Sequence, residues 1–133
     1  MTERVDVIKL HKDANALMES GKYAEARDLF IKVSGLYFKG QNYFGAAEMS
    51  YKAGESSFKL KEYEKASESF MKASEIALNK GFDRYGISAL QQALESEKAL
   101  GNTEKVEELS KKIVELNKKQ EEPEGESSFS VFS

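Results

Sequence analysis

A chain of 133 residues, of which 40% are hydrophobic, is long enough to bury a modest core and form one domain. Residues 1–120 carry 20 basic and 19 acidic side chains, whereas residues 121–133 carry four acids and no base. A body this close to neutral has no field that attracts nucleic acid or an anionic membrane, so neither is an expected partner. Cysteine is absent, which excludes disulfides and thiolate metal sites.

The first twenty residues predict an amphipathic helix. Apolar residues recur at helical spacing at Val7, Leu10, Ala14 and Leu17, with Met18 beside them. Charged residues are interspersed throughout the segment, which fits neither a secretory signal nor a membrane span. We therefore expect a cytoplasmic protein that does not insert directly into a membrane.

From Gly21 onward the chain repeats with a period of twenty residues. The blocks begin at Gly21, Gln41, Lys61, Gly81 and Gly101. Their sixth position is Ala26, Ala46, Ala66, Gly86 and Val106, and their thirteenth is Val33, Ala53, Ala73, Ala93 and Ile113. Offsets of three, four and seven within a block are those of a helix face, so each block predicts one amphipathic helix. Glycines and amides at the junctions are expected to end one helix and cap the next.

The repeat predicts an all-α stack of about six helices, each about 25 Å long at 1.5 Å per residue. Short connections make successive helices antiparallel, and blocks forty residues apart match best, which groups them into three hairpins. Gly45, Gly54 and Gly86 fall inside predicted helices, where glycine costs about 1 kcal/mol relative to alanine. Close contact between helices is the expected compensation. The helical domain spans residues 1–120, and residues 121–133 form an acidic and aromatic tail that is expected to be disordered.

The blocks that begin at Gly21 and Lys61 resemble a tetratricopeptide repeat. Gly21-Lys22-Tyr23-Ala24-Glu25-Ala26 and Lys61-Glu62-Tyr63-Glu64-Lys65-Ala66 are followed by Phe30 or Phe70 and then by Val33 or Ala73. The family's usual period is 34 residues, often closed by proline, whereas this chain has forty-residue pairs and no proline before Pro123. It is more similar to the soluble NSF attachment proteins (SNAP-like), in which stretches such as residues 38–47 recur in long-helix hairpins.

This resemblance implies a right-handed superhelical stack and, for the attachment proteins, a role in adapting a membrane-fusion helical bundle to an ATPase. The chain is roughly half as long as such an adaptor. The likeness therefore concerns shape, and we expect a protein-interaction adaptor or scaffold that binds a partner peptide or helix on the concave face. The alternatives are a SNAP-like membrane-traffic adaptor and a regulatory subunit of an enzyme complex.

The sequence contains few of the residues and motifs that catalysis or cofactor binding requires. His11 is the single histidine, no carboxylate lies within helical reach to orient its ring, and it is expected on the surface. No metal-binding spacing and no phosphate-binding glycine loop occur. We therefore predict no enzyme activity, no metal and no cofactor.

The family places partners in a groove lined by the first helix of each pair. By register, the groove positions here are His11, Asn15, Met18, Tyr51, Glu55, Phe58, Gln91 and Glu95. Exposed aromatic side chains among polar groups are typical of a peptide groove. The alternative for Tyr51 and Phe58 is that they cap the core, and the sequence does not separate the two.

The tail holds a second candidate binding element. Phe129 and Phe132 flank Val131 at the end of an acidic linker, a pattern suited to docking in a partner's groove. The same residues could instead fold back into the chain's own groove, or the tail could be inert. The protein is expected to be a monomer or a weak homodimer through its apolar first helix.

Overall fold

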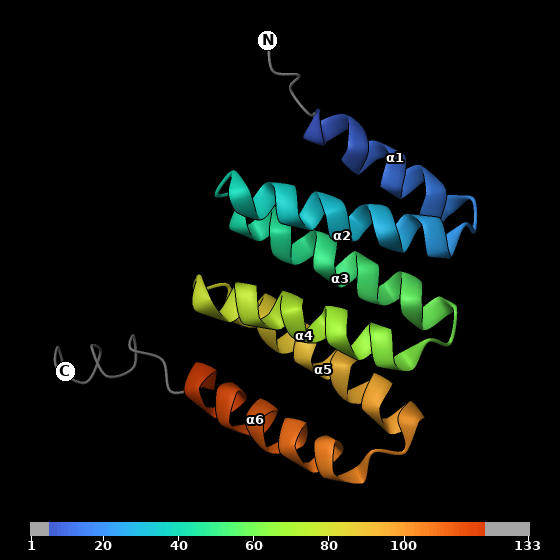
Figure 1. Cartoon of the computed structure of the whole chain (residues 1–133). Helices are drawn as coiled ribbons and strands as arrows, with labels where there is room; N and C mark the ends of the chain where they lie inside the picture. The colour runs from blue at the N-terminus through green and yellow to red at the C-terminus, as the bar shows by residue number, and fades with distance from the viewer. Residues whose placement is uncertain (1–5, 122–133) are drawn as a thin grey trace, which may run out of the picture.

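Six helices make up the part of the chain that the structure, a computed structural model, describes, which is residues 6–121 (Figure 1). They are α1 (Val7–Glu19), α2 (Tyr23–Lys39), α3 (Tyr43–Lys59), α4 (Tyr63–Asn79), α5 (Asp83–Leu100) and α6 (Thr103–Glu121). No strand occurs within these residues. The all-α prediction is confirmed, and the helices end where the twenty-residue blocks predict.

Consecutive helices run antiparallel and pack against one another along the whole stack (Figure 1). The helices form two layers. One contains α2, α4 and α6, since one hollow lies between α2 and α4 and another between α4 and α6. The other layer contains α3 and α5, whose Tyr51 and Tyr85 rings are in contact. Helix α1 comes before them in the chain and belongs to the same layer. Each layer therefore presents its own face to solvent.

The turns share one backbone conformation at twenty-residue intervals. Gly21, Gly81 and Gly101 have φ values between 74° and 83°, in the left-handed region that glycine adopts readily. At the other two junctions the same place is taken by Gln41, at 65°, and Lys61, at 61°. Gly40, expected to end its helix in this way, has an ordinary φ of −82°. The repeat thus conserves the turn geometry even where it does not supply glycine.

Replacing Lys61 by glycine is expected to raise the free energy of unfolding by about 0.5–1 kcal/mol. The substitution relieves the strain of a left-handed conformation in a residue with a Cβ, which is worth about 1–2 kcal/mol. Glycine has more backbone freedom in the unfolded chain, and this offsets about 0.5–1 kcal/mol of the gain. Lys32→Gly, at an exposed position within α2, is the control and should lower stability by nearly 1 kcal/mol. Urea unfolding measures both, and a loss of stability in Lys61→Gly would contradict the account.

Small residues let the helices approach closely at the points predicted. A Cβ added to Gly54 of α3 would lie 2.8 Å from the Phe70 ring of α4, and one added to Gly86 of α5 would lie 2.6 Å from Leu78 of α4. The expectation of close helix contact is confirmed at these two glycines. Gly45 differs, because its neighbour is the side chain of Asn42, which caps α3 by accepting a hydrogen bond from the Gly45 amide at 2.9 Å.

Candidate protein-binding surfaces

The groove residues expected from the sequence lie on α1, α3 and α5. His11 is half-buried, and its Nδ1 is 2.8 Å from the hydroxyl oxygen of Tyr37 on α2. The expectation of a surface histidine is therefore wrong in part, because the ring is held against the next helix. This contact joins α1 to α2.

Three apolar members of this set pack onto the core. Met18 packs against the buried cluster that contains Phe30. The Tyr51 ring meets Phe70 edge-on, with centroids 5.1 Å apart, and the Phe58 ring meets Tyr63 in the same way at 5.1 Å. Tyr51 and Phe58 are half-buried and also pack against the cluster around Phe70. These contacts favour core packing as their main role, while part of each ring still borders the surface.

The polar members are more accessible. Glu55, Gln91 and Glu95 are exposed, and Asn15 is half-exposed. Glu95 is engaged at the surface, since its carboxylate lies 3.3 Å from Lys98 Nζ.

Glu55 of α3 is exposed, and its carboxyl is close enough to Tyr85 of α5 to affect the pKa of that ring. Loss of water around its carboxyl raises its pKa, although Lys52 and Lys59 act in the opposite direction. The pKa of Tyr85 is raised in the same way by burial, and further by the negative charges of Glu48 and Glu55 and by Tyr51. The structure therefore brings Tyr51 and Glu55 together, with Tyr85 as a neighbour that the sequence analysis did not identify.

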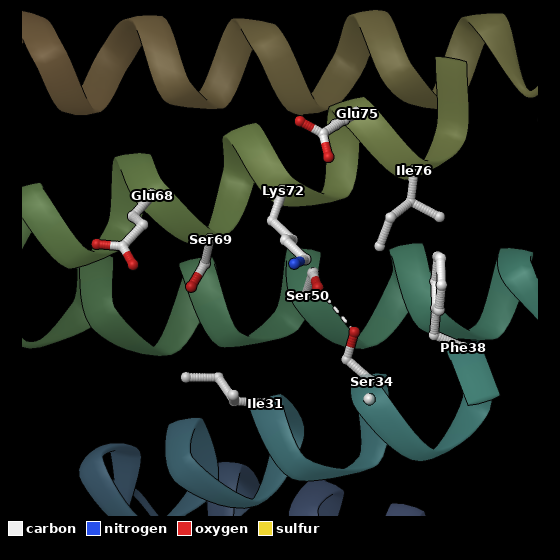
Figure 2. A pocket seen from close by; sticks show the side chains of 10 residues that line it. Ile31, Ser34, Phe38, Ser50, Glu68, Ser69, Lys72, Glu75 and Ile76 are labelled. Atoms are coloured by element: carbon white, nitrogen blue, oxygen red, sulfur yellow. Dashed lines mark hydrogen bonds between the residues drawn. The ribbon is translucent and has the colours of Figure 1, made fainter. Parts of the chain in front are cut away.

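The opposite face carries a hollow of about 480 Å³ between α2 and α4, with α3 behind it (Figure 2). Ile31 and Phe38 line it from α2 and are 52% and 47% exposed, while Ile76 lines it from α4. Glu68, Lys72 and Glu75 of α4 complete much of the lining. We call this hollow the α2–α4 groove.

The polar groups at the bottom of the α2–α4 groove already have partners. The Ser34 hydroxyl donates to the Ala46 carbonyl oxygen at 2.7 Å and lies 2.8 Å from the Ser50 hydroxyl (Figure 2). The hydroxyls of Ser34 and Ser50 are therefore engaged with each other and with the backbone, whereas Ser69 of α4 also lines the groove. Its main attraction would be the apolar surface of Ile31 and Phe38.

A second hollow of about 340 Å³ lies between α4 and α6, at the equivalent place forty residues further on. Met71, Ser74 and Leu78 line it where Ile31, Ser34 and Phe38 line the α2–α4 groove, and Lys112 corresponds to Lys72. Glu68, Lys72 and Glu75 line both hollows. The two hollows therefore adjoin across α4, and a path from α6 to α2 crosses them in turn.

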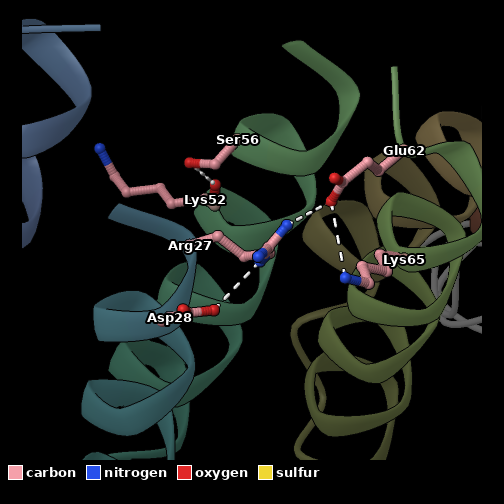
Figure 3. A network of polar contacts seen from close by, with 6 residues as sticks. All are labelled: Arg27, Asp28, Lys52, Ser56, Glu62 and Lys65. Atoms are coloured by element: carbon pink, nitrogen blue, oxygen red, sulfur yellow. Dashed lines mark hydrogen bonds and ion pairs between the residues drawn. The ribbon is translucent and has the colours of Figure 1, made fainter. Parts of the chain in front are cut away.

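An ion-pair network holds α2 near the start of α4, at one end of the α2–α4 groove (Figure 3). The Arg27 side chain is only 12% exposed and pairs with Glu62, which directly precedes α4, and with Asp28 at 3.2 Å. Lys65 Nζ adds a longer contact to Glu62 at 3.7 Å. Arg27 lies one turn before Ile31 on α2, so this network fixes the spacing between the helices that form the groove.

The sequence analysis missed Ile31 and Phe38, although its own repeat pointed to them. Ile31 is at the eleventh position of its block, as are His11 and Tyr51 in theirs. Phe38 is at the eighteenth position, as are Met18 and Phe58. The resemblance directed attention to the first helix of each pair alone. The apolar residues at the same block positions in α2 were the signal from which this surface could have been predicted.

The described residues form neither a metal-binding cluster nor a membrane span. Between residues 6 and 121, no three His, Asp or Glu side chains gather in a way that could hold a metal ion. None of the six helices combines the length and apolar character needed to cross a membrane. Neither the models of known protein families nor the sequences of curated proteins match this chain.

Proposed function

We propose that this chain is a protein-interaction scaffold that binds an apolar segment of a partner in the α2–α4 groove. The observation that carries the proposal is the exposure of Ile31 and Phe38 beside a hollow in which the hydroxyls of Ser34 and Ser50 are already paired. Its volume of about 480 Å³ lies within the range of small-ligand pockets, which is enough to receive individual side chains of a partner segment. The open groove suits a helix or an extended segment.

The side chains of the groove define the chemistry of such a partner. Fully burying an Ile or Phe side chain contributes about 1.5–3 kcal/mol, and about half of each residue here remains to be covered. The rim offers two acids, Glu68 and Glu75, and one base, Lys72. A partner segment with two or three apolar anchors and a basic neighbour would match this surface best.

The face of α1, α3 and α5 is a second candidate surface. The specific observation in its favour is that the Tyr51 and Tyr85 rings meet there across α3 and α5, with centroids 5.4 Å apart, beside the exposed side chains of Glu55 and Gln91. Repeat proteins of the kind that the sequence resembles use this face. Its Tyr51 and Phe58 rings are half-buried, whereas Ile31 and Phe38 are exposed, so this face leaves less apolar surface to cover than α2 does.

Affinity capture from the source cells with three forms of the chain separates these surfaces. The groove variant is Ile31→Lys with Phe38→Lys, and the matched control, Asn15→Lys with Gln91→Lys, adds the same charge to the opposite face. We expect the wild type and the control to bind a common partner, and the groove variant to bind it at least about tenfold more weakly, equivalent to about 1.4 kcal/mol. Circular dichroism verifies that all three forms are folded.

If instead the groove variant keeps the partner and the Asn15→Lys, Gln91→Lys control loses it, binding belongs to the face of α1, α3 and α5. Failure of every form to bind a protein would contradict the scaffold function itself. The identity of the partner then distinguishes the alternatives, because an ATPase or a helical bundle indicates a membrane-traffic adaptor, whereas a metabolic or signalling enzyme indicates a regulatory subunit.

A further inference from the structure

We infer that the tail motif, residues 129–132 of the same chain, occupies the α2–α4 groove until a partner displaces it. This inference rests on the proposed function of the groove. The motif lies outside the described residues. Its docking is supported by the place where α6 ends, by the reach of the residues that follow, and by the side chains of the groove.

The last described helix delivers the chain to the appropriate end of the stack. The Gln120 amide donates a hydrogen bond to Asp83 at 3.0 Å, which fixes the end of α6 beside the start of α5. The ends of α2, α4 and α6 lie on the same side of the molecule (Figure 1). Phe38 is near the end of α2 and Ile76 is near the end of α4, so the apolar part of the groove is at this side.

The intervening residues are long enough to reach it. Seven residues separate Glu121 from Phe129, and at 3.3–3.6 Å per residue they span about 25 Å when extended. Helices of one layer pack mainly against the helices that precede and follow them in the chain rather than against each other. At a spacing a little wider than the 8–10 Å of packed axes, the groove between α4 and α2 is about 15–20 Å from α6. The motif can therefore reach Phe38 and Ile76 with little slack, and it would cross the hollow between α4 and α6 on the way.

The motif matches the groove in chemistry. Phe129, Val131 and Phe132 are apolar residues in an otherwise acidic and polar segment, and Ile31 and Phe38 are the exposed apolar residues of the groove. The linker acids Glu122, Glu124 and Glu126 would pass Lys72 and Lys112, but Glu68 and Glu75 line the same path and oppose them. The attraction of the linker to the two lysines is thus nearly cancelled by its repulsion from the two glutamates. Burial of apolar surface therefore decides whether the tail binds the groove.

The short tether favours the chain's own tail over a second copy. A short flexible linker gives an attached group an effective concentration in the millimolar range, well above the concentrations at which proteins usually meet. A partner must then compete with the tail. Removing the two phenylalanines should increase the affinity for a groove-binding partner, by about twofold or more when the tail binds its groove with a millimolar dissociation constant.

Paramagnetic relaxation in the full chain tests this directly. Because the protein has no cysteine, Ser133→Cys introduces a unique site for a nitroxide spin label next to Phe132. In ¹⁵N-labelled protein we expect the label to broaden the amide signals of Ile31, Gly35, Phe38 and Ile76 selectively. Adding Phe129→Ser and Phe132→Ser to the labelled chain should abolish the selectivity, and Ser128→Ala with Ser130→Ala is the matched control that should retain it.

The outcomes separate this inference from the proposed function. Selective broadening that persists on dilution supports docking within one chain. Broadening that disappears on dilution, or that transfers from labelled ¹⁴N chains to unlabelled ¹⁵N chains, would overturn it in favour of a second copy. Uniform or absent broadening, or broadening at Tyr51 and Glu55, would also overturn it, and loss of partner binding in the groove variant would still uphold the scaffold function.

Discussion

Replacing Phe70 by alanine is expected to lower the free energy of unfolding by about 3–5 kcal/mol. Phe70 is 1% exposed and lies at the centre of the stack, where its ring contacts Tyr51 and faces Gly54. It belongs to the same buried cluster as Leu90 of α5 and Leu109 of α6. Truncation removes a large buried surface and leaves a cavity that the backbones on either side cannot close.

Urea unfolding followed by circular dichroism measures this effect. Ile31→Ala is the control, because Ile31 is 52% exposed and outside the buried clusters, and it should change stability by no more than about 0.5 kcal/mol. Equal effects of the two substitutions would mean that Phe70 is not the centre of the core and that the stack is packed differently.

Replacing Gly54 by valine is expected to lower the free energy of unfolding by about 2–3 kcal/mol. The added Cβ would lie 2.8 Å from two atoms of the Phe70 ring, and a rigid aromatic ring cannot move aside as the end of a flexible side chain can. Helices α3 and α4 would have to separate or the ring would have to leave its place.

The comparison for Gly54→Val is Gly35→Val in α2. Gly35 is also inside a helix, but a Cβ there meets no atom within 4 Å, so valine should leave stability within about 0.5 kcal/mol of the wild type or increase it slightly. Combining Gly54→Val with Phe70→Leu should cost less than the sum of the two single changes, because the smaller side chain makes room for the valine. Strict additivity would contradict direct contact between residues 54 and 70.

The helices could be predicted because the repeat aligns small and apolar residues at the same block positions. Ala26, Ala46 and Ala66 are completely buried, as their shared column predicts. The junctions were equally visible, but their conformation was not. A left-handed φ at Gln41 and Lys61 follows from the geometry needed to reverse the chain within two residues, and neither side chain signals it.

Contacts between distant blocks were beyond prediction from periodicity. Glu97 has an unremarkable place in its block, yet it is 7% exposed and accepts hydrogen bonds from Ser67 of α4 and from Asn102. The bond between His11 and Tyr37 depends in the same way on how two helices cross. Periodicity shows which face of a helix turns inward, but it does not show which side chain meets which.

The candidate surfaces could be predicted from the sequence only in part. The register correctly put Glu55, Gln91 and Glu95 on the exposed side of their helices. It could not show that the Tyr51 and Phe58 rings are covered in part by neighbours, or that Ile31 and Phe38 border a hollow, because both results depend on how neighbouring helices are spaced and turned. The Phe70 and Tyr63 rings of α4 cover Tyr51 and Phe58 in part, whereas the space between α2 and α4 opens a groove beside Ile31 and Phe38.

The most direct measurement for the scaffold account is a nuclear magnetic resonance footprint of the captured partner, or of its binding segment, on the ¹⁵N-labelled chain. We predict that the largest shift changes fall on Ile31, Gly35, Phe38 and Ile76, with little change at Asn15 and Gln91. Changes centred on Asn15, Tyr51 and Gln91, with the signals of α2 unaffected, would contradict the α2–α4 groove as the binding surface.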